Sequence, residues 1–371
     1  MLKLISERAN IAIEVAHVKV PGSPLYRPER EAMILRRMQA ANAGPLSSDA
    51  VARIFREVIS NCMALEQPLV IAFLGPEGTF TEAALSNMAA AGVVPAGFNP
   101  VPMDSTPAAL EAVRSGAADL ACVPIENSIE GGVLPTLDSL ATGAPLQIYA
   151  ELTLDVAFSI VTRPGTSAAE VKTVAAFPVA AAQVRNWLAA NLPGAETVLA
   201  RSNAAAAADV AAGHADAGVS TALAAQRYQL ACLAEGVVDE PTARTRFVLV
   251  GPPGPPPPRT GADRTSVVLR MDNTPGALAA AMNEFGIRDI DLTRIESRPT
   301  RTGLGTYIFL LDCVGHIDDS AVAEALKALH RRCADVRYLG SWPTGSLTGA
   351  VPPEPDEADR WLARLRKGTP P

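Results

Sequence analysis

The pattern of apolar and polar residues changes twice along the chain, and the first region is helical. Apolar residues recur there at three- and four-residue steps, as in Leu2, Ile5 and Ala9. A proline cluster after residue 20 ends the first helix, a second helix is predicted over about 27–43, and a third follows the N-cap candidates at Ser47–Asp49. We therefore expect an all-helical domain over residues 1–67.

The second region, residues 69–250, alternates short apolar strands with helices. This alternation is typical of an α/β domain with a largely parallel sheet. Strands are expected at 69–75, 119–124, 153–161, 174–176, 217–220 and 246–250, and helices at 81–91, 106–115 and 203–212.

The third region begins after a proline-rich segment. Residues 251–264 read GPPGPPPPRTGADR, with six prolines in the first eight positions, and predict a stiff, extended linker outside any core. The order strand, helix, strand, strand, helix, strand over 265–340 predicts a ferredoxin-like βαββαβ module. Residues 341–371 are expected to form a loose tail with a short helix at about 357–367. The chain is thus a multidomain α/β protein by prediction.

Length, composition and charge fit several domains that bind small molecules or proteins. The chain has 371 residues, of which 48% are apolar and 19% charged. Its net charge of −7 argues against a nucleic-acid or anionic-membrane surface. No apolar run approaches the roughly 20 residues of a membrane helix, and the N-terminus lacks a signal-peptide pattern. We expect a cytoplasmic protein.

The cysteines and histidines do not predict a metal site or a disulfide framework. Five cysteines are scattered without a Cys-x-x-Cys pair, and the four histidines lack the His-Glu-x-x-His spacing. The glycines form none of the usual nucleotide-binding motifs. We therefore expect reduced thiols, no metal and no cofactor.

Two segments that follow strands carry residues suited to binding an acid. GPEGTFT at 75–81 precedes a helix, whose free amide groups favour a carboxylate, although an ordinary turn would also explain it. VPIENSIEGG at 123–132 places Glu126, Asn127 and Ser128 after an apolar strand, where ligands commonly bind in α/β sheets. A helix cap would explain the last two residues equally well.

Two further groups of residues have both a functional and an ordinary interpretation. Thr245 and Arg246 lead into the last strand. The threonine side chain can orient a hydroxyl group that departs from a ligand, and the arginine can attract a ligand's carboxylate. Surface arginines at such positions are common. Arg8 and Lys19 lie eleven residues apart, so both can project from one helix face. This pattern fits an anion-binding site, and it fits an ordinary solvent-exposed helix face equally.

Taken together, these segments resemble the prephenate dehydratase family. GPEGTFT, VPIENSIEGG and the triplet Thr245-Arg246-Phe247 are similar to that family's signatures in order and spacing, and the resemblance covers nearly all of residues 69–340. It implies two α/β lobes of the periplasmic-binding type with the active site in the cleft between them. Residues 69–146 and 221–250 would form one lobe, and 147–220 the other.

The same resemblance implies roles for individual residues. Thr245 would assist departure of the ring hydroxyl, and Gln183 would contact the substrate from the second lobe. The other implied site residues are Glu126, Asn127 and Ser128 in the cleft and Gly78, Thr79, Phe80, Arg246 and Phe247 around the substrate. Where many family members have Ser-His-Pro-Gln, this chain has Ala176-Phe177-Pro178-Val179, so a hydroxyl and an imidazole are missing there.

The module after the linker resembles an ACT regulatory domain. Its segments PGAL at 275–278 and ESRP at 296–299 are similar to those that bind phenylalanine in dehydratases of this kind. The implied phenylalanine contacts are Gly276, Ala277, Leu278, Glu296, Ser297 and Arg298. We expect phenylalanine to bind between the ACT modules of two chains, in a homodimer or homotetramer.

The first 66 residues resemble the helical chorismate mutase domain that some bacteria fuse ahead of this dehydratase. The implied chorismate contacts are Arg8, Lys19, Arg30, Glu31 and Glu66. In that family the first helix begins further upstream and carries an arginine that acts across the dimer. Either the natural start lies upstream of Met1 or the mutase site is incomplete, and we expect weak or absent mutase activity.

Three functions follow from these patterns. The first is a prephenate dehydratase that makes phenylpyruvate for phenylalanine synthesis and is inhibited by phenylalanine. The second is a bifunctional enzyme that also converts chorismate to prephenate. The third is a non-catalytic amino-acid sensor, which only the altered stretch Ala176–Val179 favours.

Overall fold

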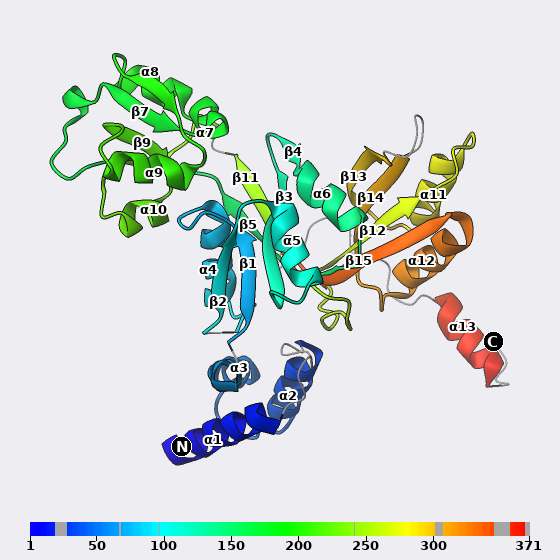
Figure 1. Cartoon of the computed structure of the whole chain (residues 1–371). Coiled ribbons are helices and arrows are strands. Elements are labelled where there is room, and N and C mark those ends of the chain that lie inside the picture. Colours follow the sequence, from blue (N-terminus) through cyan, green and yellow to red (C-terminus); the bar gives the residue numbers. More distant parts are fainter. Residues whose placement is uncertain are drawn as a thin grey trace. The chain divides into compact units, whose positions relative to one another are not determined.

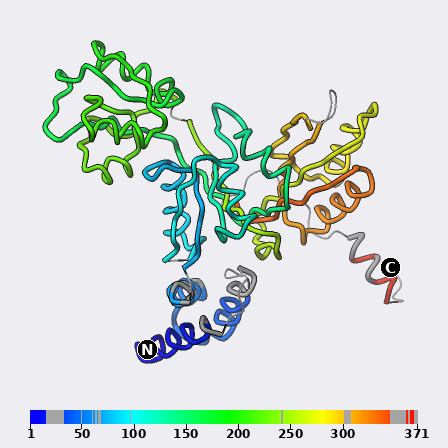
Figure 2. Tube along the Cα trace, viewed as in Figure 1, coloured from blue at the N-terminus to red at the C-terminus, as the bar shows by residue number. Residues whose placement is uncertain are grey.

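The computed structural model describes residues 1–18, 28–66, 68–95, 97–240, 242–300, 307–344 and 357–367. Figure 1 labels the helices and strands, and Figure 2 follows the chain from its blue N-terminus to its red C-terminus. Within these residues, no helix has both the length and the apolar character needed to cross a membrane.

The predicted N-terminal helices are confirmed. They are α1 (Leu2–Val18), α2 (Pro28–Ala40) and α3 (Ser48–Glu66). Few of their apolar side chains are buried, among them Ala12, Leu35, Ala52, Ile59 and Cys62. Many others are exposed, including Leu2, Leu4, Ile11, Met33 and Ile54.

The first sheet has the strand order β2-β1-β3-β11-β5, and β4 pairs with the end of β3. Its strands are β1 (Val70–Leu74), β2 (Asn99–Met103), β3 (Leu120–Asn127), β4 (Gly131–Gly132), β5 (Gln147–Asp155) and β11 (Arg244–Gly251). The intervening helices are α4 (Phe80–Ala90), α5 (Thr106–Arg114) and α6 (Leu134–Ala141). The sequence NPVPM of β2 did not predict a strand, but its two prolines are tolerated because β2 lies at the sheet edge.

The second sheet has the order β10-β6-β9-β7-β8. Its strands are β6 (Phe158–Thr162), β7 (Thr173–Ala176), β8 (Glu196–Leu199), β9 (Ala217–Ser220) and β10 (Ala231–Val237). The helices of this part are α7 (Pro178–Gln183), α8 (Arg185–Asn191), α9 (Asn203–Ala211) and α10 (Ala222–Arg227), with a 3₁₀ turn at Ala168–Glu170. The alanine-rich α9 packs closely on β9, since a Cβ at Gly218 would lie 2.9 Å from the carbonyl oxygen of Ala206.

The chain crosses between the two sheets at different points from those expected. The predicted single strand at 153–161 is two strands, because pairing with the first sheet ends at Asp155 and the Val156 amide donates to the Ala243 carbonyl. The division at 147 and 221 was therefore wrong: β5 belongs to the first sheet and β10 to the second. We call the part built on the first sheet lobe 1 and residues 158–237 lobe 2.

The C-terminal sheet confirms the predicted βαββαβ order. It is antiparallel, with strand order β13-β14-β12-β15, and consists of β12 (Asp263–Arg270), β13 (Leu292–Pro299), β14 (Tyr307–Val314) and β15 (Asp335–Pro343). The helices α11 (Ala277–Gly286) and α12 (Ser320–Arg332) supply Phe285, Val322 and Leu329 to its core. The predicted loose tail begins too early, because β15 continues to Pro343 and Trp342 is fully buried. The short helix expected near 357–367 is α13 (Glu357–Arg366).

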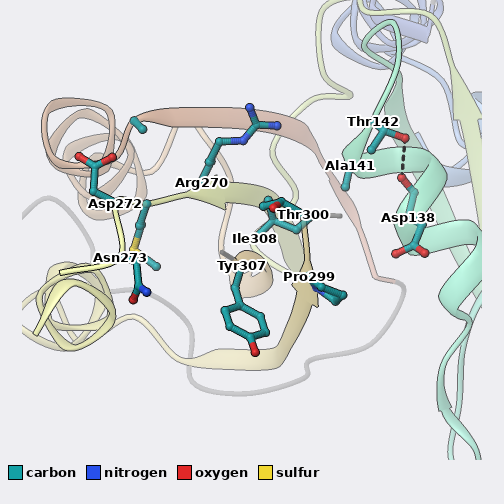
Figure 3. Close-up of a pocket in the computed structure, with 12 residues that line it drawn as sticks. Asp138, Ala141, Thr142, Arg270, Asp272, Asn273, Pro299, Thr300, Tyr307 and Ile308 are labelled. Atoms are coloured by element: carbon teal, nitrogen blue, oxygen red, sulfur yellow. Dashed lines mark hydrogen bonds between the residues drawn. The ribbon is translucent and has the colours of Figure 1, made fainter. Parts of the chain in front are cut away.

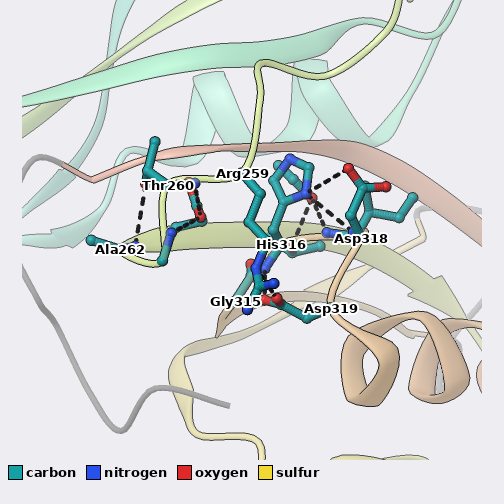
Figure 4. A network of polar contacts seen from close by, with 12 residues as sticks. Arg259, Thr260, Ala262, Gly315, His316, Asp318 and Asp319 are labelled. Carbon is teal, nitrogen blue, oxygen red and sulfur yellow. Dashed lines mark hydrogen bonds and ion pairs between the residues drawn. The ribbon is translucent and has the colours of Figure 1, made fainter. Parts of the chain in front are cut away.

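The proline-rich linker is attached to the third sheet's module instead of running free. Pro257 is buried, and its carbonyl lies 2.9 Å from Nε2 of the buried His316. Figure 4 shows His316 with its neighbours Asp318, Asp319 and Arg259. His316 Nδ1 accepts from the Asp318 amide, which leaves the hydrogen on Nε2 for Pro257. Arg259 forms an ion pair with Asp319. The expectation that the linker lies outside any core was therefore wrong for this part of it.

Residues 137–151, the linker and the C-terminal module form one compact unit. Arg264 and Glu151, both buried, form an ion pair at 2.8 Å, and Trp342 Nε1 donates to the same carboxylate at 3.0 Å. Arg337 donates to the carbonyls of residues 140, 142 and 143, just past the end of α6. These contacts fasten β15 to β5 and to the end of α6.

Gly340 is the closest point of this contact. Its φ is +129°, and an added Cβ would lie 2.4 Å from the Ile148 carbonyl oxygen. We expect Gly340→Ala to destabilise the protein by about 2–4 kcal/mol, because backbone must move and the left-handed conformation is strained. Gly286→Ala is the matched control, since nothing lies within 4 Å of its added Cβ. Thermal melts compare the two variants, and equal melting temperatures would contradict the close approach.

Candidate active site

The predicted residues around position 127 meet those around position 245 across two neighbouring strands, β3 and β11. Asn127 Nδ2 donates to Thr245 Oγ1 at 2.9 Å. Glu126 forms an ion pair with Arg246 at 2.8 Å, and Ser128 Oγ accepts from the Arg244 amide at 2.9 Å. The structure therefore brings together residues that lie more than a hundred positions apart in the sequence.

The side chain of Asn127 is held in one orientation. Its Oδ1 accepts from the amides of Ile129 and Glu130 at 2.8 and 3.1 Å, in the turn between β3 and β4. The amide nitrogen is thereby directed at Thr245. Since the Thr245 oxygen accepts this bond, its own hydrogen remains available to a second partner.

The ion pair between Glu126 and Arg246 is asymmetric. The Arg246 side chain is 8% exposed, whereas that of Glu126 is 37% exposed. A buried guanidinium needs an opposite charge, and Glu126 supplies one. Arg246 is thus already engaged by a carboxylate within the protein, and its contact with a substrate stays a prediction.

Phe247 and Gln183 are both buried, but with different consequences. Phe247 is 2% exposed and follows Arg246 on β11, so it faces the core and the structure gives it a packing role. Gln183, at the end of α7, is 8% exposed, and its Oε1 has no hydrogen-bond partner in the described part of the chain. A buried acceptor without a partner is unfavourable, so Gln183 remains available for a ligand's donor.

The altered stretch after β7 is apolar. Ala176 ends that strand and is fully buried, and Pro178 begins α7. No hydroxyl or imidazole is therefore present at residues 176–179, as the sequence implied.

The segment Gly75–Thr81 satisfies several of its own polar groups. Thr79 is the N-cap of α4, accepting from the Glu82 amide and donating to the Leu74 carbonyl at 3.1 Å. The Glu82 carboxylate in turn accepts from the Gly78 amide. The amide of Gly78, just before the start of α4, is therefore already bonded within the protein. Phe80 packs edge-on against Phe158 of lobe 2, with ring centroids 5.5 Å apart.

The residues expected to bind phenylalanine lie at the start of α11 and on β13, an edge strand. Gly276 has a φ of +82° and is the N-cap residue of α11, which Ala277 and Leu278 continue. Glu296, Ser297 and Arg298 belong to β13.

Arg298 has a partner that the sequence did not suggest. Its guanidinium makes two hydrogen bonds to Asp138 of α6, at 2.8 and 3.1 Å, which raise the pKa of Arg298 above its ordinary value. The structure thus directs Arg298 toward α6. Asp138 could not be found from the sequence because no motif marks it.

A cavity of about 350 Å³ lies beside Asp138 (Figure 3). Its lining comes from the end of α6 and from the ends of β12, β13 and β14. It includes charged and aromatic side chains, namely Asp138, Arg270, Asp272 and Tyr307. None of the six residues expected to bind phenylalanine lines this cavity.

The residues implied for chorismate binding are only partly covered by the structure. Arg8 is exposed on α1, and Lys19 lies outside the described residues. Arg30 and Glu31 belong to α2 and Glu66 ends α3, but their side chains lie outside the described part. Their roles stay predictions.

Family models match three successive parts of the chain. Residues 1–67 match chorismate mutase type II, 71–254 match prephenate dehydratase, and 265–331 match the ACT domain. The chain is 74% identical to a prephenate dehydratase of Mycobacterium sp. (strain JLS) over 306 residues, which cover 81% of this chain and 97% of that protein.

Solved structures show the same fold. A prephenate dehydratase from Arthrobacter aurescens, in complex with L-Phe, is 42% identical with a TM-score of 0.73, covering 81% of this chain and 98% of that one. GqqA, described as a novel type of quorum quenching acylase, is 30% identical with a TM-score of 0.66, covering 74% and 98%.

Proposed function

This chain belongs to the prephenate dehydratase family, and on that premise we propose that it converts prephenate to phenylpyruvate with loss of water and CO₂. The observation that carries the assignment of the site is the bond from Asn127 to Thr245, because it fixes a hydroxyl with its hydrogen free. No cofactor is needed in this proposal, since formation of the aromatic ring drives the reaction.

The leaving hydroxyl is assisted by Thr245. Its oxygen is occupied by the Asn127 amide, so the threonine donates a hydrogen bond, but not its proton, to the ring hydroxyl of prephenate. The proton that converts this hydroxyl to water comes from Glu126, water or the substrate itself. A donor placed where negative charge develops stabilises the transition state. Glu126, Asn127, Ser128 and Gln183 complete the proposed catalytic set.

The ring carboxylate must lose its charge as CO₂ leaves. A bare buried cation nearby would stabilise the charged ground state and oppose this step. Because Arg246 is paired with Glu126, its charge is balanced before the substrate binds. Substrate contacts are proposed from Gly78, Thr79, Phe80 and Arg246, with Phe247 supporting β11 from behind.

The direction of the Asn127 bond can be tested by reversing it. Asn127→Asp replaces the donor by an acceptor, which competes with the substrate for the Thr245 hydrogen. We expect kcat to fall about a hundredfold or more with a smaller change in KM, as for other lost transition-state donors. Thr245→Ala should abolish turnover with the fold intact, and phenylpyruvate formation measures both.

Asn191→Asp, the same exchange at an exposed asparagine outside the candidate site, serves as the matched control. A Thr245→Ala variant with full activity would sink the assignment of the site. Wild-type protein that binds prephenate tightly but releases no phenylpyruvate would instead support the non-catalytic sensor.

Regulation is proposed to act through the ACT module. Phenylalanine would bind at Gly276, Ala277, Leu278, Glu296, Ser297 and Arg298, between two chains of a homodimer or homotetramer. Arg298 lies on the expected binding strand and holds Asp138 of α6, the helix that follows β3 and β4 in the sequence. The pair is thus a short route from the regulatory module to the strand that carries Asn127.

Breaking this pair should weaken regulation. Asp138→Asn removes the charge that holds Arg298, and we expect the phenylalanine concentration for half-inhibition to rise about threefold or more. Asp335→Asn, at an exposed position in the same module, is the control. Inhibition curves at fixed prephenate compare them, and superimposable curves for all three proteins would contradict the route.

A second activity is favoured by the match of residues 1–67 to chorismate mutase type II. We propose a bifunctional enzyme that also converts chorismate to prephenate, with Arg8, Lys19, Arg30, Glu31 and Glu66 as candidate contacts. A cytoplasmic location stays a prediction.

Chorismate consumption by the purified protein tests the second activity. Arg30→Ala should remove chorismate consumption and leave prephenate turnover unchanged, because the two activities use different domains. Turnover of prephenate alone by the wild type would mean that the helical domain is a scaffold.

A further inference from the structure

Lobe 2 meets the Gly75–Thr81 segment of lobe 1 through α10. Arg227, the last residue of α10, forms ion pairs with both Glu77 and Glu82, the latter at 2.7 Å. The Glu82 side chain is 12% exposed and that of Arg227 is 35% exposed. One guanidinium thus bridges two carboxylates on either side of Thr79 and Phe80.

The same helix makes two further contacts with this segment. Thr221, the N-cap of α10, is buried and donates to the Gly78 carbonyl at 2.6 Å. Gly78 itself, with a φ of +85°, faces Ala224, and an added Cβ would lie 3.0 Å from the Ala224 Cβ. Both ends of α10 therefore contact the segment, and its backbone has little room to shift.

We propose that Arg227 is a positioning residue for the dehydratase reaction. It holds the Gly75–Thr81 segment at a fixed position relative to lobe 2. The expected effect of Arg227 on turnover rests on the proposed dehydratase function. Glu82 accepts a hydrogen bond from the Gly78 amide and also pairs with Arg227. The guanidinium therefore orients the Glu82 carboxylate, which in turn holds the backbone of the segment at Gly78. Thr79 and Phe80, proposed substrate contacts, lie between the two paired glutamates.

Removing the guanidinium would act on geometry more than on stability. A partly exposed ion pair contributes little to the free energy of unfolding. Without Arg227, however, Glu77 and Glu82 are two like charges close together in the sequence with no cation between them. Their repulsion favours rotation of the Glu82 side chain away from Gly78. The segment then loses its ion pairs with lobe 2 and the bond between Glu82 and Gly78, and keeps the Thr221 bond and the contact with Ala224.

A shift of about 1 Å in such a segment is enough to reduce turnover by ten- to a hundredfold. For Arg227→Met we expect a fall in kcat of about tenfold or more with a melting temperature close to that of the wild type. Arg227→Lys should recover only part of the rate, because a single ammonium lacks the planar fork that bridges two carboxylates. Arg185→Met, at an exposed arginine of the same lobe, is the matched control.

Hydrogen exchange provides a readout that does not depend on turnover. In Arg227→Met, exchange should become faster in residues 75–82 and 221–228 together, while β1 and β9 keep the wild-type rate. Unchanged kcat and exchange would overturn the proposal, and so would faster exchange spread evenly over both lobes. If wild-type protein does not turn over prephenate, the proposed function fails, whereas faster exchange confined to the two segments would still support the positioning role.

Discussion

The pairing of β3 with β11 is the constraint on which the rest of the site depends. The chain leaves lobe 1 at the end of β5, builds all of lobe 2, and returns as β11 beside β3. Only this return places Thr245 next to Asn127 and Arg246 next to Glu126. At the crossing itself, Arg244 pairs with Asp155 at 2.8 Å, so the outgoing and returning strands are also joined to each other.

This arrangement ties the hydroxyl of Thr245, the proposed hydrogen-bond donor to the substrate, to the position of the lobes. Thr245 lies on a strand that enters directly from lobe 2, and Gly75–Thr81 touches lobe 2 through α10 and Phe158. A movement of lobe 2 relative to lobe 1 would therefore displace both Thr245 and the Gly75–Thr81 segment. Interfaces of packed side chains tend to switch between discrete arrangements instead of deforming gradually, so such contacts are suited to control.

The sequence predicted those elements whose apolar pattern agrees with their final environment. The buried strands β1, β9 and β12 and the helices α4, α5 and α12 are of this kind. The failures have physical causes. The prolines of β2 argue against a strand, although an edge strand tolerates them. The sequence at 153–161 stays apolar where the pairing changes from one sheet to the other, so it gives no sign of the break. Gly340 and Ser341 are typical of a loop, but β15 continues through them.

The candidate site residues could be proposed from their motifs, but their partners within the protein could not. Nothing local shows that Glu126 pairs with Arg246, that Asp138 pairs with Arg298, or that the Gly78 amide is bonded to Glu82. Each choice depends on which carboxylate the fold brings within about 3 Å, and that distance is set by packing between elements far apart in the sequence.

These pairings give the site its electrostatic character. Prephenate carries two carboxylates, and only one of them leaves, so uniform positive charge would stabilise the substrate more than the transition state. In this chain Arg227 and Arg246 are both bound to glutamates. In the proposed mechanism the substrate then meets neutral donors and acceptors: the Thr245 hydroxyl, the Asn127 amide that orients it, and Oε1 of Gln183, which has no partner in the described part of the chain. Such groups can stabilise a departing hydroxyl without holding the leaving carboxylate in its charged form, so the proposal depends on the internal neutralisation of these arginines.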